Sequence, residues 1–205
     1  MLYSDIVIRK GIRNERSISL LIRKLADSVM QPTAVKRLQN ILQGDGTKIG
    51  RNTVASYLDY IEEAYLCFSI PNFTDSIPQR DTIQKHYFYD NGILNLFLIN
   101  PEPKLLENLV AIALYRKHGK ALSYYNYNIE VDFFLPNEQT AIQMSYSMAS
   151  PSTADREISA LVKLNSYKPL KRALVITYND ERTITANGLT IEVIPIWKWL
   201  LEQNL

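Results

Sequence analysis

Cysteine, glycine and long apolar runs are scarce in this chain. Its 205 residues include one cysteine, Cys67, so no internal disulfide can form, and we expect this residue in the core. Seven glycines and nine prolines are too few for a disordered chain. No apolar run approaches the roughly 20 residues that a membrane-spanning helix requires, and the N-terminus lacks the basic and apolar regions of a signal peptide. These absences predict a reduced, cytoplasmic protein that does not enter the membrane.

Several catalytic patterns are absent as well. The sequence contains no Gly-x-x-x-x-Gly-Lys-Ser/Thr loop, no Ser-His-Asp spacing and no zinc pattern. His86 and His118 lie far apart without a cysteine partner, so we expect ordinary surface or packing roles for both. Tyr124, Tyr125 and Tyr127 can stack on nucleic acid bases, although strand tyrosines more often pack across a sheet.

The composition is that of an ordinary globular protein with an uneven charge. Apolar residues make up 46% and charged residues 21%, which predicts a packed core in one large or two small domains. The net charge is +2, yet residues 1–51 hold ten Lys or Arg and four Asp or Glu. A basic front favours a polyanionic partner such as DNA, while a solvated helix surface is the plainer explanation.

The first third of the chain predicts three helices and a hairpin. Two strand-like segments, 66–73 and 85–90, are joined by a polar loop over 74–84. Helices followed by a hairpin are the order of a winged helix-turn-helix, which we assign to residues 14–92. The helices are marked by apolar residues at helical spacing over 18–29, 33–42 and 52–65, with Asn14 or Ser17, Thr33, and Asn52 as their capping residues.

In such a module the third helix, together with the residues just before it, would contact DNA. Polar and basic side chains lie on the exposed side of that helix, and acidic side chains lie further along it. The acidic group, Asp59, Glu62 and Glu63, would repel phosphate, and a protein-docking role is the alternative. The DNA contacts predicted are Lys48, Arg51, Thr53 and Ser56.

The remaining residues predict a mixed sheet with helices on both faces, an α/β domain over residues 93–205 in a chain that is α+β overall. A well-buried helix over 104–118 comes first, and a helix capped by Ser152 or Thr153 lies in the middle. The predicted strands are 121–125, 129–135, 141–146, 172–177 and 189–194, with a final helix over 196–202.

The strand pair around Pro136-Asn137 has one polar face. Asp132 and Glu130 alternate with apolar residues on the first strand, and Gln143 and Ser145 do so on the second. These side chains could line one edge of a site.

Several segments resemble a known family in their order and spacing, over nearly the whole chain. The chain is similar to the C-terminal region of bacterial and archaeal AAA-type ATPases, a region described as a domain of unknown function. The resemblance implies a winged helix in front and a PD-(D/E)XK nuclease-like, restriction-endonuclease-like sheet behind. The matching segments are Arg51–Val54, Tyr57–Leu66, Lys85–Gly92, Leu105–Val110, Glu130–Phe133, Ile142-Gln143, Arg156-Glu157 and Pro195–Leu200.

The resemblance also implies a missing partner domain. In full-length relatives of this kind a P-loop ATPase domain precedes this region. Residues 1–13 would then be the linker from the ATPase domain, and the chain would be a C-terminal fragment, either a truncated gene product or an excised piece. ATPase activity would belong to that domain, and the chain could also form homo-oligomers.

Nuclease chemistry in that fold uses Mg²⁺ held by carboxylates and a lysine beside the attacking water. By resemblance, Glu107 matches the helical acid and Asp132 the strand acid, so these two are the candidate metal ligands. Gln143 stands in place of the second acid, and Ser145 in place of the lysine. Glu107 can instead favour the helix dipole, and Asp132 can pair with Arg156 or Lys163. The positions of Gln143 and Ser145, two of the four that the nuclease needs, are therefore degraded.

The sequence leaves three functions open. The first is a recognition or assembly region that binds DNA or a partner protein, with no resident cofactor. The second is an active Mg²⁺-dependent DNA nuclease. The third is a protein-assembly module without a nucleic acid partner.

Overall fold

The computed structural model describes residues 4–12 and 14–203, and the chain divides into two units. Unit 1 comprises Met1–Ser69 and Ser76–Ile99, and unit 2 comprises Ile70–Asp75 and Asn100–Leu205. The predicted linker over 1–13 falls partly outside the described residues, and its described part contains helix α1, Ser4–Lys10.

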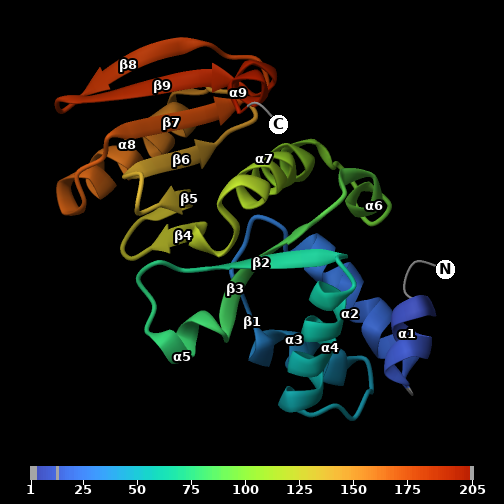
Figure 1. The fold of residues 1–205 in the computed structure, drawn as a ribbon. Helices are drawn as coiled ribbons and strands as arrows, with labels where there is room; N and C mark the ends of the chain where they lie inside the picture. The colour runs from blue at the N-terminus through green and yellow to red at the C-terminus, as the bar shows by residue number, and fades with distance from the viewer. Residues whose placement is uncertain (1–3, 13, 204–205) are drawn as a thin grey trace. The chain divides into compact units, whose positions relative to one another are not determined.

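Unit 1 combines helices with a three-stranded sheet of order β1-β3-β2 (Figure 1). Strand β1 pairs antiparallel with β3, with Thr33 opposite Gln84. The apolar faces of α2 and α3 are buried, as their helical spacing predicts. After α1, its elements are α2 (Glu15–Asp27), β1 (Thr33–Ala34), α3 (Val35–Gly44), α4 (Arg51–Glu63), β2 (Cys67–Pro71), α5 (Ile77–Arg80), β3 (Ile83–Phe88) and α6 (Asn91–Asn95).

The helix boundaries of unit 1 confirm one predicted cap and correct two. Asn14 caps α2, since its Oδ1 accepts from the Ser17 backbone N–H at 3.1 Å. Thr33 does not cap the second helix, because it pairs with Gln84 in the sheet and α3 begins at Val35. Asn52 lies inside α4, where Gly50 is the N-cap. The predicted loop over 74–84 contains α5, where Gln79 Oε1 accepts from the Ser76 N–H at 3.3 Å.

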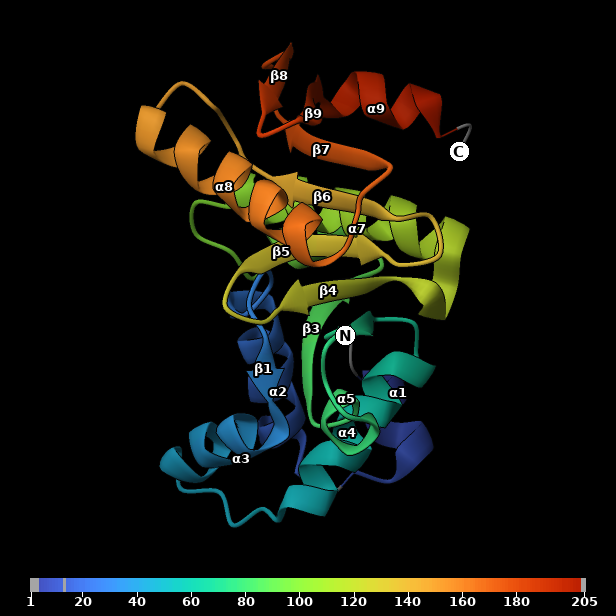
Figure 2. The same ribbon diagram turned by 90° about the vertical axis from the view of Figure 1, so that its left-hand side faces the viewer.

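Unit 2 is built around a six-stranded mixed sheet of order β4-β5-β6-β7-β9-β8. Strands β4, β5 and β6 are antiparallel neighbours, whereas β6, β7 and β9 run parallel. Helix α8 covers one face of this sheet and α7 the other (Figures 1 and 2). Its elements are α7 (Glu102–His118), η1 (Gly119–Ala121), β4 (Ser123–Asn126), β5 (Glu130–Leu135), β6 (Thr140–Met144), α8 (Pro151–Tyr167), β7 (Arg172–Thr177), β8 (Arg182–Ala186), β9 (Leu189–Pro195) and α9 (Ile196–Glu202).

The mixed α/β class is confirmed, with two corrections in unit 2. Strand β8 was not predicted, because its side chains are mostly exposed and lack an apolar run. The Asn187-Gly188 pair that joins it to β9 has positive φ at both residues, and this dipeptide is a strong hairpin signal. Helix α8 begins at Pro151 after Ser150, rather than after Ser152 or Thr153, because proline fits the first turn of a helix.

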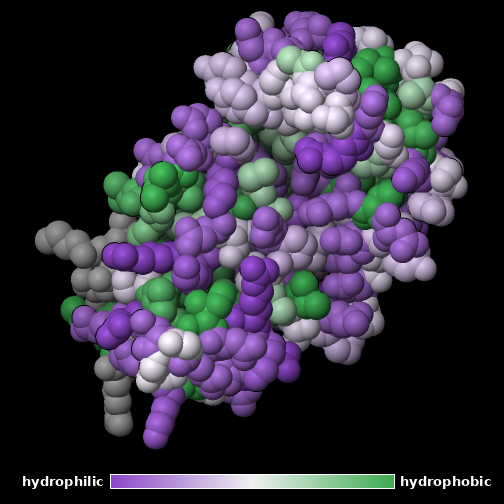
Figure 3. All heavy atoms as spheres, turned by 180° about the vertical axis from the view of Figure 1, so that it is seen from behind, coloured by the Kyte–Doolittle hydropathy of each residue, from purple (hydrophilic) through white to green (hydrophobic). Residues whose placement is uncertain are grey.

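The surface is largely hydrophilic on the face shown in Figure 3. No helix in the described part of the chain is long and apolar enough to cross a membrane.

Candidate functional site

The strand pair singled out in the sequence forms a side-chain cluster where the β5–β6 ladder ends. The last regular pair is Phe133 with Ile142. Beyond it, the Gln143 Oε1 accepts from the Asp132 backbone N–H at 2.8 Å, and the Asp132 Oδ2 accepts from the Met144 backbone N–H at 2.9 Å. Side chains therefore take over the backbone hydrogen bonding at this point of the sheet.

Gln143 is the centre of this cluster. Its Nε2 donates to the Glu130 carbonyl oxygen at 3.2 Å and to the Glu157 Oε2 at 2.8 Å. The side chain is 5% exposed, and both its donor and its acceptor atoms are engaged. An amide supplies a donor and an acceptor at one position, which a carboxylate cannot do. The glutamine is thus built into the sheet as a structural connection between β5, β6 and α8.

Glu157 is the acid that the sequence interpretation missed. It lies on α8 and is 3% exposed, and burial raises the pKa of its carboxyl group. A hydrogen bond from Arg156 opposes that rise in pKa, with Nε donating to Oε1 at 3.0 Å, while Asp132 and Glu130 add to the rise. Arg156, one of the two expected partners of Asp132, donates to the Glu157 Oε1 through Nε at 3.0 Å and through Nη2 at 2.5 Å. The contact between Glu157 and Gln143 depends on how α8 packs against the sheet, so the sequence alone carries no signal for it.

The raised pKa of Glu157 predicts a dependence of stability on pH. A carboxyl group with a raised folded-state pKa binds its proton more tightly in the folded protein. Its contribution to the free energy of unfolding is therefore present at low pH and lost as the pH rises. We expect the free energy of unfolding, relative to Glu157→Gln, to fall as the pH rises from the ordinary carboxyl pKa to the raised value. Urea titrations of both proteins between pH 4 and 7 measure this, and a constant difference would contradict it.

The other two predicted positions differ in their surroundings. Ser145 is 8% exposed, and its Oγ donates to the Ser147 carbonyl oxygen at 2.9 Å. Glu107 is fully buried in α7. Among the residues described by the structure, no three His, Cys, Asp or Glu side chains form a group able to hold a metal ion. The structure brings Asp132 and Gln143 into direct contact and joins Glu157 to them.

The predicted DNA contacts of unit 1 gather at the start of α4. Lys48, Arg51 and Thr53 are exposed, and Ser56 is half-buried one turn along the helix. In the part of the chain that the structure describes, neither Lys48 nor Arg51 forms an ion pair. Both cations therefore remain available to an anionic partner.

The segment that carries Lys48 is held in place from α3. The Nε2 atoms of Gln39 and Gln43 both donate to the Ile49 carbonyl oxygen, at 3.2 and 3.0 Å. These two residues are four positions apart, so they lie on the same helix face. They fix the chain immediately before Gly50, the N-cap of α4.

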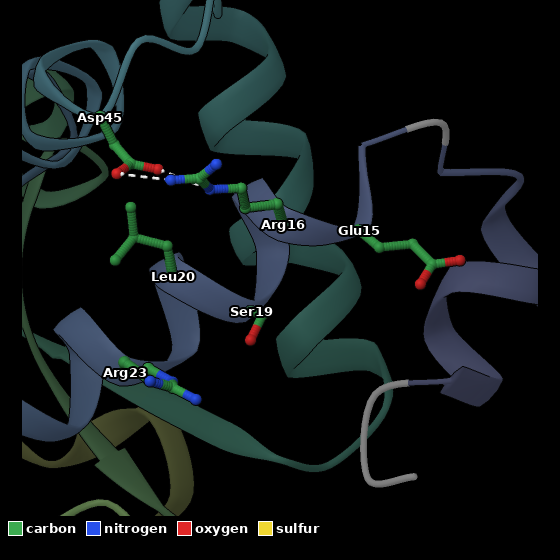
Figure 4. A pocket seen from close by; sticks show the side chains of 6 residues that line it. All are labelled: Glu15, Arg16, Ser19, Leu20, Arg23 and Asp45. Atoms are coloured by element: carbon green, nitrogen blue, oxygen red, sulfur yellow. Dashed lines mark hydrogen bonds and ion pairs between the residues drawn. The ribbon is translucent and has the colours of Figure 1, made fainter.

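A second connection fixes the turn that follows α3. The Arg16 guanidinium on α2 makes a bidentate ion pair with Asp45, with Nε–Oδ2 at 2.9 Å and Nη2–Oδ1 at 3.0 Å. Figure 4 shows this pair beside Leu20 and Arg23, with Glu15 turned away, in a pocket of about 450 Å³. The turn and the segment before α4 are thus both anchored to the helices of unit 1.

The far end of α4 is acidic. Glu63 forms an ion pair with Lys10, whose ammonium also lies 4.9 Å from the centre of the Tyr60 ring. Asp59 is exposed on the same half of the helix. Charge therefore changes from positive to negative along α4, in the same sense as the helix dipole.

The remaining candidates are Cys67, three tyrosines and two histidines. Cys67 is 1% exposed, and Tyr124 and Tyr125 are buried, as expected for strand residues, whereas Tyr127 is exposed. His86 is buried, and burial lowers its pKa to about 4. His118 contacts Glu138, with Nδ1–Oε1 at 3.1 Å.

Comparison with known proteins gives the family. A family model described as "Domain of unknown function (DUF8612)" matches residues 1–104, just over half of the 205 residues. The chain belongs to this family. Similar proteins include an uncharacterized protein of Methanocaldococcus jannaschii, 34% identical over 97% of this chain and 47% of its own length. Another is an uncharacterized protein of Haemophilus influenzae, 24% identical over 97% of this chain and 49% of its own length. No solved structure matches the chain significantly.

These matches confirm a domain of unknown function and add a fact about length. This DUF8612 member spans about half the length of the curated relatives it matches. The family match ends at the start of α7, so the cluster around Gln143 lies outside it. The relation to AAA-type ATPases stays a prediction.

Proposed function

We propose that this chain is a recognition region whose unit 1 binds duplex DNA as a winged helix, within a longer AAA-type ATPase. The observation that carries the proposal is the pair of free cations, Lys48 and Arg51, on an anchored segment at the start of α4. The order α2-β1-α3-α4-β2-β3 and the sheet order β1-β3-β2 support the winged helix assignment.

The charge gradient along α4 supports binding through its N-terminal end. Phosphates are attracted by Lys48, Arg51 and the positive end of the helix dipole. The hydroxyl group of Thr53 lies in the first turn of α4, and that of Ser56 lies in the second. Asp59 and Glu63 lie in the C-terminal half of α4, at the opposite end from Lys48 and Arg51, and Glu63 is paired with Lys10. Contact through the N-terminal end of α4 therefore brings the phosphates closest to the cations and farthest from these acids.

The longer protein would carry an ATPase domain. Its support is the resemblance of the sequence segments and the length of the relatives, which are about twice as long as this chain. The additional length of those relatives could accommodate an ATPase domain. Hydrolysis would then be coupled to the DNA contact made by unit 1.

For unit 2, the proposal is a PD-(D/E)XK-like fold kept for binding or assembly. The order α7-β4-β5-β6-α8-β7, with β6 and β7 parallel, supports the assignment. Gln143 is occupied by its hydrogen bonds to β5 and α8, and Ser145 brings no charge. We therefore expect no cleavage of labelled single- or double-stranded DNA with Mg²⁺ or Mn²⁺. Cleavage that disappears in Asp132→Ala would overturn this assignment and favour the nuclease.

The duplex contact is tested with the double variant Lys48→Ala/Arg51→Ala. Each phosphate contact contributes about −0.9 to the slope of log affinity against log salt concentration. In the double variant the magnitude of this slope should therefore decrease by about 1.8, and the affinity should fall roughly tenfold. Fluorescence anisotropy with a labelled random-sequence duplex at 50 to 200 mM NaCl measures both quantities.

The matched control removes two cations that are already paired. Lys24 contacts Asp27 and Lys198 contacts Glu181, so Lys24→Ala/Lys198→Ala loses the same charge elsewhere. We expect this control to bind the duplex nearly as the wild type does. Equal losses in the two double variants would reduce the effect to net charge, and absence of any salt-dependent binding would favour the assembly module.

A further inference from the structure

An aromatic pocket opens at the C-terminal end of α8 in unit 2. It has a volume of about 300 Å³, at the lower limit of typical ligand pockets. Its inner wall is formed by Phe134 of β5 and by Phe73, whose rings meet edge to face with centroids 5.0 Å apart. Tyr167, Lys168 and Gln139 line the rim.

The walls of this pocket are fixed by hydrogen bonds. The Phe73 backbone N–H donates to the Tyr124 carbonyl oxygen at 2.8 Å, which ties the segment to β4. On the other side, the Gln139 carbonyl oxygen accepts from the Lys171 N–H at 2.9 Å. The turn after β5 and the chain after α8 are therefore held together. A preformed pocket avoids the entropic cost of ordering its walls around a ligand.

An exposed tyrosine and a phenylalanine ring covered by a lysine flank the pocket. Tyr167 is 57% exposed at the end of α8. The Lys168 ammonium lies 4.9 Å from the centre of the Phe73 ring, so a cation already covers the π face of this ring. A planar base that took the place of the ammonium would leave Lys168 free to contact the adjoining phosphate.

The charge around the pocket is positive. From Ile158 to Asn179 the sequence has four Lys or Arg residues and no Asp or Glu. Arg172 is paired with Glu192 and Glu202, but within the described residues no ion pair engages Lys163 or Lys171. Two nearby acids have partners of their own: Asp75 accepts a hydrogen bond from the Asn72 amide, and Glu138 contacts His118.

We propose that this pocket binds one base of a single-stranded nucleic acid, whose backbone follows Lys163, Lys168 and Lys171. A cationic track with exposed aromatic faces is the combination that holds single strands without sequence preference. A base in a duplex is paired and stacked, so it cannot enter a pocket of this kind. The site is separate from the cluster around Gln143, because Tyr167 lies ten residues, or about 15 Å, beyond Glu157 along α8.

The proposal is tested with the full chain and three labelled probes: a thymidine dodecamer, a uridine dodecamer and a duplex. Loss of one base–aromatic stack costs about 1–3 kcal/mol, so Tyr167→Ala should weaken binding of single strands at least fivefold. Lys168→Ala should lower the salt slope by about 0.7. Both changes are expected with DNA and RNA, unless the 2′-hydroxyl contributes, in which case one probe is preferred.

Matched controls come from the same unit. Tyr178 is 56% exposed and stacks on Tyr146, and Lys198 is paired with Glu181. Tyr178→Ala and Lys198→Ala should therefore leave single-strand binding unchanged. The variant Lys48→Ala/Arg51→Ala, which tests the duplex contact, should also retain it, so failure of one proposal is distinguishable from failure of the other. Wild-type affinity in both Tyr167→Ala and Lys168→Ala would overturn the pocket, as would single-strand binding lost only in Lys48→Ala/Arg51→Ala.

Discussion

Replacing Gln143 with alanine should lower the free energy of unfolding by about 2–4 kcal/mol, because the buried Glu157 carboxyl group and the part-buried Asp132 N–H each lose a hydrogen bond. The Asp132 N–H and the Glu157 carboxylate each contact this amide at 2.8 Å. Leaving a buried donor or acceptor unsatisfied costs about 1–3 kcal/mol, and the Glu130 carbonyl loses a further hydrogen bond. Urea denaturation followed by circular dichroism measures the change.

Two further variants define what the glutamine contributes. Gln31 is exposed, so Gln31→Ala should change the free energy of unfolding by less than about 0.5 kcal/mol. Gln143→Glu keeps the shape but removes the donor to Glu157 and adds a negative charge beside it. The new carboxyl should have a raised pKa in the folded state, so this variant should lose stability as the pH rises above the ordinary carboxyl pKa. Wild-type stability of Gln143→Glu at pH 7, with further stabilisation by Mg²⁺, would instead support a metal role for this position.

The second large effect is expected for Asn72→Ala, again about 2–4 kcal/mol. Asn72 is 5% exposed, and its amide nitrogen donates to Asp75 at 2.9 Å and to the Asn126 carbonyl oxygen at 3.0 Å. Its amide oxygen accepts from the Asn126 N–H at 2.9 Å. Without these bonds the neighbouring Phe73 is less firmly placed, so single-strand affinity should fall together with stability.

Urea denaturation and anisotropy on the same preparation test both parts of this prediction. Asn40 is exposed on α3 in unit 1, and Asn40→Ala serves as the control, with little change in either quantity. Loss of stability with unchanged single-strand affinity would separate Asn72 from the pocket. Unchanged stability would show that the segment carrying Phe73 is held by other contacts.

The sequence predicted the elements that are marked by patterns of neighbouring residues, such as apolar spacing and helix caps. The buried helix α7 follows from the spacing of its apolar residues, and cap chemistry narrowed the cap of α2 to Asn14 or Ser17, of which the structure has Asn14. Thr33 was misassigned because its partner, Gln84, is 51 residues away in the sequence and offers a sheet position that competes with a helix cap. Strand β8 has no buried face, so only its Asn-Gly turn marked it.

The candidate sites show the same division. The sequence identified Asp132 and Gln143 as neighbours, and described Gln143 as a lost metal ligand. Its actual partners come from β5 and α8, and no pattern in one dimension shows that a strand glutamine meets a helix glutamate. The aromatic pocket brings together Phe73 and Tyr167, which lie 94 residues apart in the sequence, so neither residue predicts the other.

The attachment of residues 72–74 to β4 has a consequence for self-association. An outer strand of a sheet exposes N–H and C=O groups on which another chain can pair, and this is a route to aggregation. On β4, the Asn126 N–H and the carbonyl oxygens of Tyr124 and Asn126 are already occupied by this segment. At the other border of the sheet, β8 presents exposed Arg182 and Thr183. Any strand that a partner adds to this sheet would therefore be expected to pair with β8.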